Sequence, residues 1–400
     1  MHMNRRLWKS RCWILLTVSL LTVIAWAVVM PHPSSAATDN PPGNEPTSSN
    51  LPPHVVIFIS DVAIPDGPAV TKQQDSGPKK DQDLPQISAQ GMQFNRAVAS
   101  SSELAAGQRI LETGTVFSVD ASTRTLADHM KLKGYRLMIA GDTAFESESG
   151  QEGDFRFDVI AVSLERFELH DSPNRFQQFL AHEVQHDHRP LCLIVRDRNA
   201  KTAASNKAPS TSSLNHAFIA VREALPTDST IFMYTAICGE SAKATSDACD
   251  HCLLDVPLTV VWDRHIPAGR TSDALISTVD ILPTLVELIG ATPPSEIDGR
   301  SFASVLRGES HEHRDVAFSI IDSGKENERY CVQDSRFIYL SAKSFHTDAV
   351  ALYDLLSDPR AESDLKADPG YRQHVLEMRD QLNLWLQRHG RPSLATENSK

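Results

Sequence analysis

The chain has 400 residues, of which 41% are hydrophobic and 22% charged, and its net charge is −12 at pH 7. This composition is typical of a globular protein, and the length allows one large or two smaller domains. The negative charge excludes nucleic acid from the expected partners, because phosphate binding requires a basic surface. It also disfavours a polyanionic glycan unless a local basic pocket offsets the field.

The N-terminus has the features of an export signal. Four basic residues between positions 5 and 11 precede an uncharged apolar run at 12–30, and small residues follow at 34–37. The run is longer than the roughly 7–15 residues of a typical signal core and close to the roughly 17–25 that span a bilayer. We therefore expect residues 1–37 to be a signal peptide or a signal anchor. The domain would be periplasmic or extracellular, with residues 12–30 in the inner membrane if they are not cleaved.

A linker and a buried strand follow the export signal. Residues 38–53 are rich in Pro, Ser, Asn and Thr, which predicts a flexible linker. Residues 54–60 (HVVIFIS) form a continuous apolar run that ends at Asp61, as expected for a central parallel strand. In open α/β sheets, ligands bind at the carboxyl ends of the strands. Asp61 is therefore the first candidate site residue.

Helix-like and strand-like patterns then alternate along the chain. Strand-like runs cover 157–162, 191–195, 230–235 and 256–262, and helical patterns cover 175–188, 212–225 and 281–289. Residues 125–140 combine a helix, a stop at Gly134 and a strand. Residues 84–94 predict a helix and a turn. This alternation predicts an α/β fold.

The pattern changes beyond Gly308. Short alternating runs at 316–321, 330–332, 337–340 and 350–355 predict a small antiparallel sheet. Residues 371–388 predict a helix whose apolar face would pack on that sheet. We assign residues 315–390 to a C-terminal α+β subdomain and residues 391–400 to a polar tail.

Two segments resemble one known family. Residues 255–308 carry VPL…IPAGR.SDAL.S.VDILPTL.EL.G…P..IDGRSF…L.G, which resembles the closing segment of the catalytic domain in the sulfatase family, within the alkaline-phosphatase-like superfamily. Residues 352–365 (LYDL..DP..E..L) resemble the family's C-terminal signature. The resemblance implies that residues 54–314 form a mixed, mostly parallel sheet flanked by helices. A small C-terminal antiparallel sheet plus a helix would complete the fold.

The resemblance fails at the family's nucleophile. There, C-x-P-S-R supplies a cysteine that is oxidised to formylglycine, the group that attacks sulfate, and a helix follows that ends in Thr-Gly. Alignment from Phe94 or from Thr113-Gly114 places Leu104 at the cysteine position, and leucine cannot become an aldehyde. Serines at 100–102 lie nearby, but a serine cluster before a helix is more often a cap or loop element than a nucleophile. We expect no catalytic residue at this position.

Most of the family's metal and sulfate ligands are replaced as well. The first strand of the family ends in two adjacent aspartates, whereas Val62 follows Asp61 here. A later strand should supply Asp and His or Asn, but residues 236–239 are Ala-Ile-Cys-Gly. The sulfate-binding Gly-Lys-x-His is replaced at residues 141–144 by Gly-Asp-Thr-Ala, whose acidic residue would repel sulfate. Because calcium takes about six to eight oxygen ligands, we expect a vestigial metal position at Asp61 and no resident cofactor, with calcium only if the family's site survives.

Residues 182–186 (HEVQH) match the zinc-metalloprotease signature H-E-x-x-H. In that motif two histidines one helical turn apart hold zinc and the glutamate acts as general base. His182 and His186 are therefore candidate zinc ligands, and Glu183 is a candidate base. Polar residues and a proline follow directly, which is typical of a solvated surface helix. We favour that interpretation, with adventitious metal affinity.

Five cysteines lie beyond the export signal, which is an odd number for an exported domain. Cys249 and Cys252 form C-x-x-C around His251, and Cys238 is the nearest further thiol. In an oxidising compartment we expect a disulfide among Cys238, Cys249 and Cys252 rather than a zinc site.

Core positions are kept while positions that carry chemistry are replaced, which is the pattern of a pseudoenzyme. The sequence therefore favours an exported, catalytically degenerate sulfatase-like protein with a binding or regulatory role. Its expected partner is a sulfated small molecule or glycan, or an active sulfatase relative. Three alternatives stay open. The first is an active sulfuric-ester hydrolase with an atypical site, of the arylsulfatase or glycan sulfatase type, which needs metal at Asp61 with help from Asp66. The second is a zinc-dependent hydrolase at His182 and His186, and the third is a membrane-tethered interaction protein.

Overall fold

A computed structural model describes residues 52–63, 87, 90–117, 123–141, 159–163, 173–197, 212–239, 254–342, 351–359 and 361–393. Contacts divide the chain into two units, Met1–Asn50 and Leu51–Lys400, and every described residue lies in the second. The expected export signal at 1–37 and most of the expected linker at 38–53 lie outside the described ranges. Within those ranges no helix is both long and apolar enough to cross a membrane.

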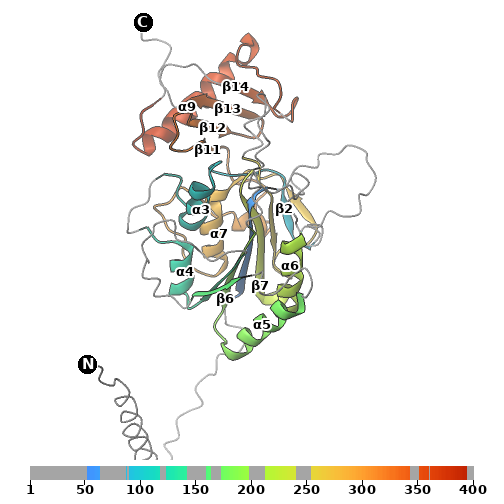
Figure 1. The fold of residues 1–400 in the computed structure, drawn as a ribbon. Coiled ribbons are helices and arrows are strands. Elements are labelled where there is room, and N and C mark those ends of the chain that lie inside the picture. Colours follow the sequence, from blue (N-terminus) through green and yellow to red (C-terminus); the bar gives the residue numbers. More distant parts are fainter. Residues whose placement is uncertain are drawn as a thin grey trace, which may run out of the picture. The chain divides into compact units, whose positions relative to one another are not determined.

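An eight-stranded sheet occupies the centre of the second unit, in the order β5-β4-β6-β1-β7-β8-β2-β9 (Figure 1). Its strands are β1 (His54–Val62), β2 (Met92–Phe94), β4 (Arg136–Gly141), β5 (Val159–Ser163), β6 (Leu191–Asp197), β7 (Thr230–Cys238), β8 (Leu258–Val261) and β9 (Arg270–Ser272). The five strands from β5 to β7 in this order are parallel, and β8 is antiparallel to both of its neighbours. The expected mixed, mostly parallel sheet is confirmed.

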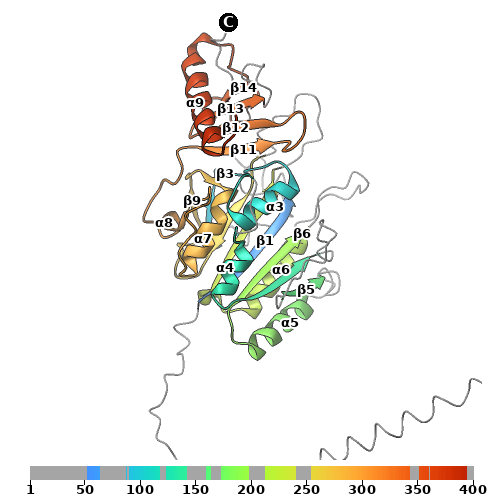
Figure 2. The ribbon, with the colours of Figure 1, turned by 90° about the vertical axis from the view of Figure 1, so that its left-hand side faces the viewer.

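Helices cover both faces of this sheet (Figures 1 and 2). One face carries α3 (Leu104–Thr113), α4 (Leu126–Leu132) and α7 (Ile281–Leu288), and the other carries α5 (Pro173–His186) and α6 (Ser212–Ala224). Successive residues of a strand point to opposite faces, so Val55 and Ile57 pack in the α3 layer while Val56 and Phe58 pack in the α5 layer. Burial on both faces explains why the central strands are continuous apolar runs.

Local signals set the ends of two helices on the α3 face of the sheet. Helix α4 begins after Thr125, whose hydroxyl accepts from the Asp128 backbone N–H while the Asp128 carboxylate accepts from the Thr125 N–H, a capping box. Helix α3 ends at Gly114, which has φ +68° and donates its N–H to the Ile110 carbonyl at 2.8 Å. Glycine is the residue that adopts this left-handed conformation without steric cost.

A second, four-stranded sheet follows in the C-terminal part, and all its neighbouring strands are antiparallel. Its strands are β11 (Ala317–Ile321), β12 (Arg329–Gln333), β13 (Phe337–Ala342) and β14 (Ala351–Asp354), and helix α9 (Arg372–Arg388) packs on them. Trp385 of α9 is buried and stacks on Phe318 of β11 with ring centroids 4.9 Å apart. The predicted antiparallel sheet plus helix is confirmed.

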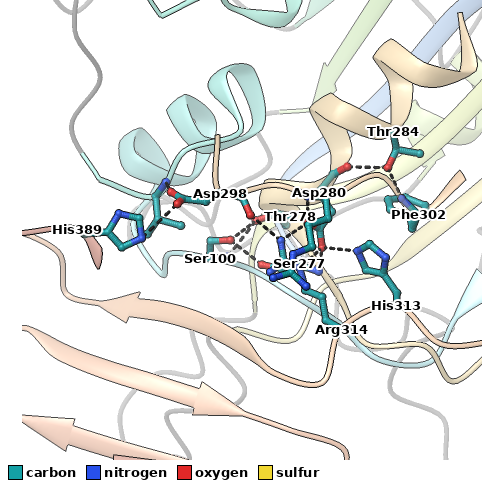
Figure 3. Close-up of polar contacts among 12 residues, drawn as sticks. Ser100, Ser277, Thr278, Asp280, Thr284, Asp298, Phe302, His313, Arg314 and His389 are labelled. Carbon is teal, nitrogen blue, oxygen red and sulfur yellow. Dashed lines mark hydrogen bonds and ion pairs between the residues drawn. The ribbon is translucent and has the colours of Figure 1, made fainter. Parts of the chain in front are cut away.

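A buried ionic network joins the start of α7 to the connection that leads into the second sheet (Figure 3). Asp280 is fully buried, and its carboxylate accepts from the Ser277 and Arg300 backbone N–H groups and pairs with His313 and Arg314. Burial alone would raise the pKa of Asp280, but the hydrogen bonds from His313 and Arg314 outweigh it and lower that pKa. A buried carboxylate is stable only when it is paired in this way.

The structure differs from the sequence expectations at element ends and at short strands. Strand β7 continues past the expected end at 235, because residues 236–238 still pair with β1. Residues 92–94, expected in a helix and turn, form β2. Strands β3 (Ala97–Val98), β9 and β10 (Ile276–Ser277) were not predicted, since two or three residues carry no periodicity. The expected boundary at 314/315 falls between α8 (Ala303–Leu306) and β11.

Candidate functional site at the strand ends

Asp61 and Arg196 meet at the carboxyl ends of the two central strands β1 and β6. The parallel register places Ile59 opposite Arg196, so Asp61, two residues further along β1, projects from the same face of the sheet, toward α3. The Arg196 Nε donates to Asp61 Oδ1 at 2.7 Å, and the two side chains are 13% and 6% exposed. The first candidate residue is therefore one half of a buried ion pair.

The ion pair continues into helix α3. Arg196 Nη1 donates to Gln108 Oε1 at 2.8 Å, and Gln108 Nε2 donates to Glu112 Oε1, one helical turn away, at 2.9 Å. Burial raises the pKa of Glu112, while Gln108 and the charge of Arg196 oppose that rise. Asp61, Arg196, Gln108 and Glu112, together with Cys238 at the end of β7, are called the strand-end cluster below.

Cys238 contributes a neutral thiol to the strand-end cluster. Its Sγ donates to the Asp61 backbone carbonyl at 3.3 Å. Burial, aided by the charges of Asp61 and Glu103, raises the pKa of this thiol to about 12, so it stays protonated at neutral pH. Cys238 forms no disulfide, so of the pairings expected among Cys238, Cys249 and Cys252 only that of Cys249 with Cys252 stays a prediction. The thiol points at a buried carbonyl instead, and Cys249 and Cys252 lie outside the described residues.

The strand-end cluster does not fit a calcium ion. Calcium prefers about six to eight oxygen ligands at about 2.3–2.6 Å, whereas the carboxylate of Asp61 already accepts from a guanidinium. The neighbouring positions offer the aliphatic side chain of Val62 and the protonated thiol of Cys238. Nowhere in the described ranges do three His, Cys, Asp or Glu side chains come together as a metal site. Asp66, the expected helper, lies outside those ranges.

The expected nucleophile position is the first residue of α3. Leu104 is half-buried there, and Glu103 before it makes no side-chain cap but pairs with Lys325 Nζ at 2.6 Å. The three serines before the helix have structural partners: Ser100 Oγ lies 2.7 Å from Ser277 Oγ, Ser101 Oγ accepts from the Glu103 N–H, and Ser102 Oγ accepts from the Asp322 N–H. These hydroxyls fix the backbone that precedes α3 and its contact with the second sheet.

The HEVQH segment forms the last part of helix α5, and its side chains point in two directions. The His182 and His186 rings stack with centroids 3.8 Å apart, and both residues are exposed. Glu183 instead pairs with Arg136 Nη1 at 3.1 Å, and the Arg136 side chain is only 6% exposed. The candidate base therefore serves as the partner of a buried arginine. The described residues supply no third ligand for a zinc ion beside His182 and His186. The zinc-hydrolase alternative stays a prediction.

Sequence reasoning missed Arg196 and Gln108 as members of the site. A usable signal exists, because a basic residue near the carboxyl end of a predicted central strand must lie at the same sheet edge as Asp61. Gln108 carries no comparable signal, since its role depends on how α3 packs against that edge.

Comparison with known proteins agrees with this architecture. The family model "N-sulphoglucosamine sulphohydrolase, C-terminal" matches residues 251–388. The chain is 23% identical over 354 residues to the ulvan-active sulfatase of Formosa agariphila, covering 73% of this chain and 70% of that protein.

Solved structures with the same fold include a 2-O GAG sulfatase, with a TM-score of 0.64 at 17% identity over 84% of this chain and 92% of that one. The phosphonate monoester hydrolase of Agrobacterium radiobacter has a TM-score of 0.60 at 17% identity over 84% and 96%. At these identities the structural likeness establishes the fold alone. Together with the sequence matches, it identifies this chain as a sulfatase-like protein with the fold of the alkaline-phosphatase-like sulfatases.

Proposed function

We propose that this chain is an exported, catalytically degenerate sulfatase-like protein that has a binding or regulatory role. The observation that carries the proposal is the aliphatic Leu104 on the first turn of α3, where the family places its sulfate-attacking group. Nucleophilic catalysis needs a side chain that can be activated by a base or a metal. Leucine has none, and the nearby serine hydroxyls already have structural partners.

The electrostatics of the strand-end cluster support the same proposal. A sulfate ester is an anion, and its hydrolysis requires positive charge that faces the substrate. The cation in this cluster, Arg196, is already bound to Asp61 and Gln108, and Glu112 lies beside them. Lys325, near the start of α3, is likewise bound, to Glu103 and Asp322.

The ligand class follows from the relatives and is part of the proposal. One relative is named for activity on ulvan, and the matching family model is named for N-sulphoglucosamine. Ulvan fragments and N-sulphoglucosamine are therefore the first probes for binding. An active sulfatase is the alternative partner, which a pseudoenzyme would regulate by contact. Export would place the protein in the periplasm or outside the cell, where residues 12–30 could tether it to the inner membrane.

The test combines turnover and binding on the purified full-length protein. We expect no release of sulfate from an aryl sulfate or from ulvan fragments, and measurable binding of one of the probes by calorimetry. The Asp61→Asn variant is the control, because it separates turnover at this site from a contaminating sulfatase. Turnover by the wild type that Asp61→Asn abolishes would establish an active hydrolase with an atypical site and end the proposal.

A further inference from the structure

We propose that Arg196 is a built-in cation in the strand-end cluster. It takes the place of the divalent metal that the sulfatase fold implies there. The inference rests on the sulfatase fold and is independent of whether any turnover occurs. The fold implies a metal next to Asp61, but the residues around this carboxylate do not fit one. A cation of another kind must therefore balance the charge of Asp61.

The side chain of Arg196 balances the charge of Asp61. Asp61 is 5% exposed at the end of the central strand, and a carboxylate in such a place needs a cation beside it. Arg196 Nε lies 2.7 Å from Asp61 Oδ1, within the range of a charge-assisted hydrogen bond. Because this cation is a side chain of the protein itself, the compensation needs no ion from solution.

Arg196 also imitates a metal in joining separate elements. A bound ion would draw together ligands from several segments, and the guanidinium does so with its fixed fork of donors. One nitrogen binds Asp61 of β1 and another binds Gln108 of α3, while the side chain itself belongs to β6. The sheet edge and the first helix of its α3 layer are thereby held in one arrangement by a residue of the chain.

The same side chain excludes a metal from Asp61. An ion bound to this carboxylate at about 2.3–2.6 Å would lie next to the guanidinium, and two positive charges repel strongly in a buried site. The thiol of Cys238, protonated and donating to the Asp61 carbonyl, offers no compensating ligand. Binding of a divalent cation is thus expected only when Arg196 is removed.

The experiment is a melting-temperature series on the full-length protein with and without millimolar calcium or EDTA. We expect neither additive to shift the wild type. Arg196→Gln should melt about 5–10 °C lower, because it leaves a buried carboxylate without its partner. Calcium should restore part of that loss. The double variant Asp61→Asn with Arg196→Gln should recover most of it without calcium, since no charge then needs a partner.

Controls and refuting outcomes separate this role from ordinary packing. Arg189→Gln removes an arginine that pairs with Asp187 at the surface, and calcium should not affect its melting temperature. The proposal is overturned if calcium or EDTA shifts the wild type, or if the double variant melts no higher than Arg196→Gln. If Arg196→Gln does not fold, the double variant still decides. If the wild type releases sulfate and calcium does not shift its melting temperature, the proposed function is refuted while the role of Arg196 stands.

Discussion

Replacement of Asp280 by asparagine tests the buried network that ties α7 to the second sheet. The wild-type carboxylate is fully buried and accepts hydrogen bonds from two backbone N–H groups, from His313 and from Arg314. An asparagine keeps the shape of the side chain but removes its charge. Its amide nitrogen is a hydrogen-bond donor and would face groups that donate to the wild-type carboxylate. Breaking a buried ion pair from one side costs about 3–5 kcal/mol. We expect Asp280→Asn to lose an amount in that range.

The measurement is urea denaturation of the full-length protein at neutral pH, where this loss would lower the midpoint by about 1 M. The matched control is Asp368→Asn, which changes an exposed carboxylate that caps Gly370 at 2.8 Å and should cost about 1 kcal/mol or less. A loss for Asp280→Asn no larger than that of the control would refute the reasoning that the network is a structural anchor.

The pH dependence gives a second check on the same variant. The folded-state pKa of Asp280 lies below its ordinary value of 3.8. The ionised carboxylate therefore stabilises the fold above that value, and the contribution disappears as pH falls through the folded pKa. The stability difference between wild type and Asp280→Asn should accordingly be constant near neutral pH and shrink in acid below about pH 4. A difference that stays constant in acid would contradict the assignment of the charge.

Three further predictions concern packing and reactivity. Gly299→Ala should destabilise the protein strongly, because the added Cβ would lie 2.1 Å from a backbone carbonyl oxygen. Gly290→Ala has open space around the added Cβ and should cost only about 1 kcal/mol, because alanine disfavours the positive φ at this position. Thermal melts of the two variants test this difference. Trp385→Ala should lower the free energy of unfolding by about 3–5 kcal/mol, because it removes the aromatic contact between α9 and the second sheet. The control Leu384→Ala changes a side chain that is 56% exposed and should cost under about 1 kcal/mol in the same urea assay. The thiol of Cys238 is buried and has a pKa of about 12, so it should react with a thiol reagent at pH 8 only after the protein unfolds. Rapid modification of the native wild type that is absent in Cys238→Ser would contradict the buried position of this thiol.

The fold was predictable because its core elements carry long, continuous signals. The apolar run at 54–60 and the helical spacing at 281–289 each identify an element that is buried on the sides the pattern indicates. The misses are short strands such as β2 and β10, whose two or three residues exist only because a neighbouring strand offers hydrogen bonds. Such elements are set by tertiary pairing rather than by local preference.

The candidate site was less predictable than the fold. The register from Phe94 to Gly114 aligns Leu104 with the family's cysteine position, and the structure shows that this residue is the first of α3. The HEVQH motif could be matched by spacing, but spacing did not show that Glu183 turns to Arg136 on another element. Of the three cysteines expected to share a disulfide, Cys238 takes no part in one, because cysteine count and compartment say nothing about where a thiol points.

By itself, the sequence determined the class of fold and the succession of its main elements. These depend on local periodicity and on residues that are neighbours in the chain. Only the tertiary structure decided that Arg196 neutralises Asp61, a residue 135 positions away, and that Gln108 completes the contact. The physical reason is that a buried charge is balanced by whichever side chain the strand register and helix packing place within about 3 Å of it, and that choice is made in space.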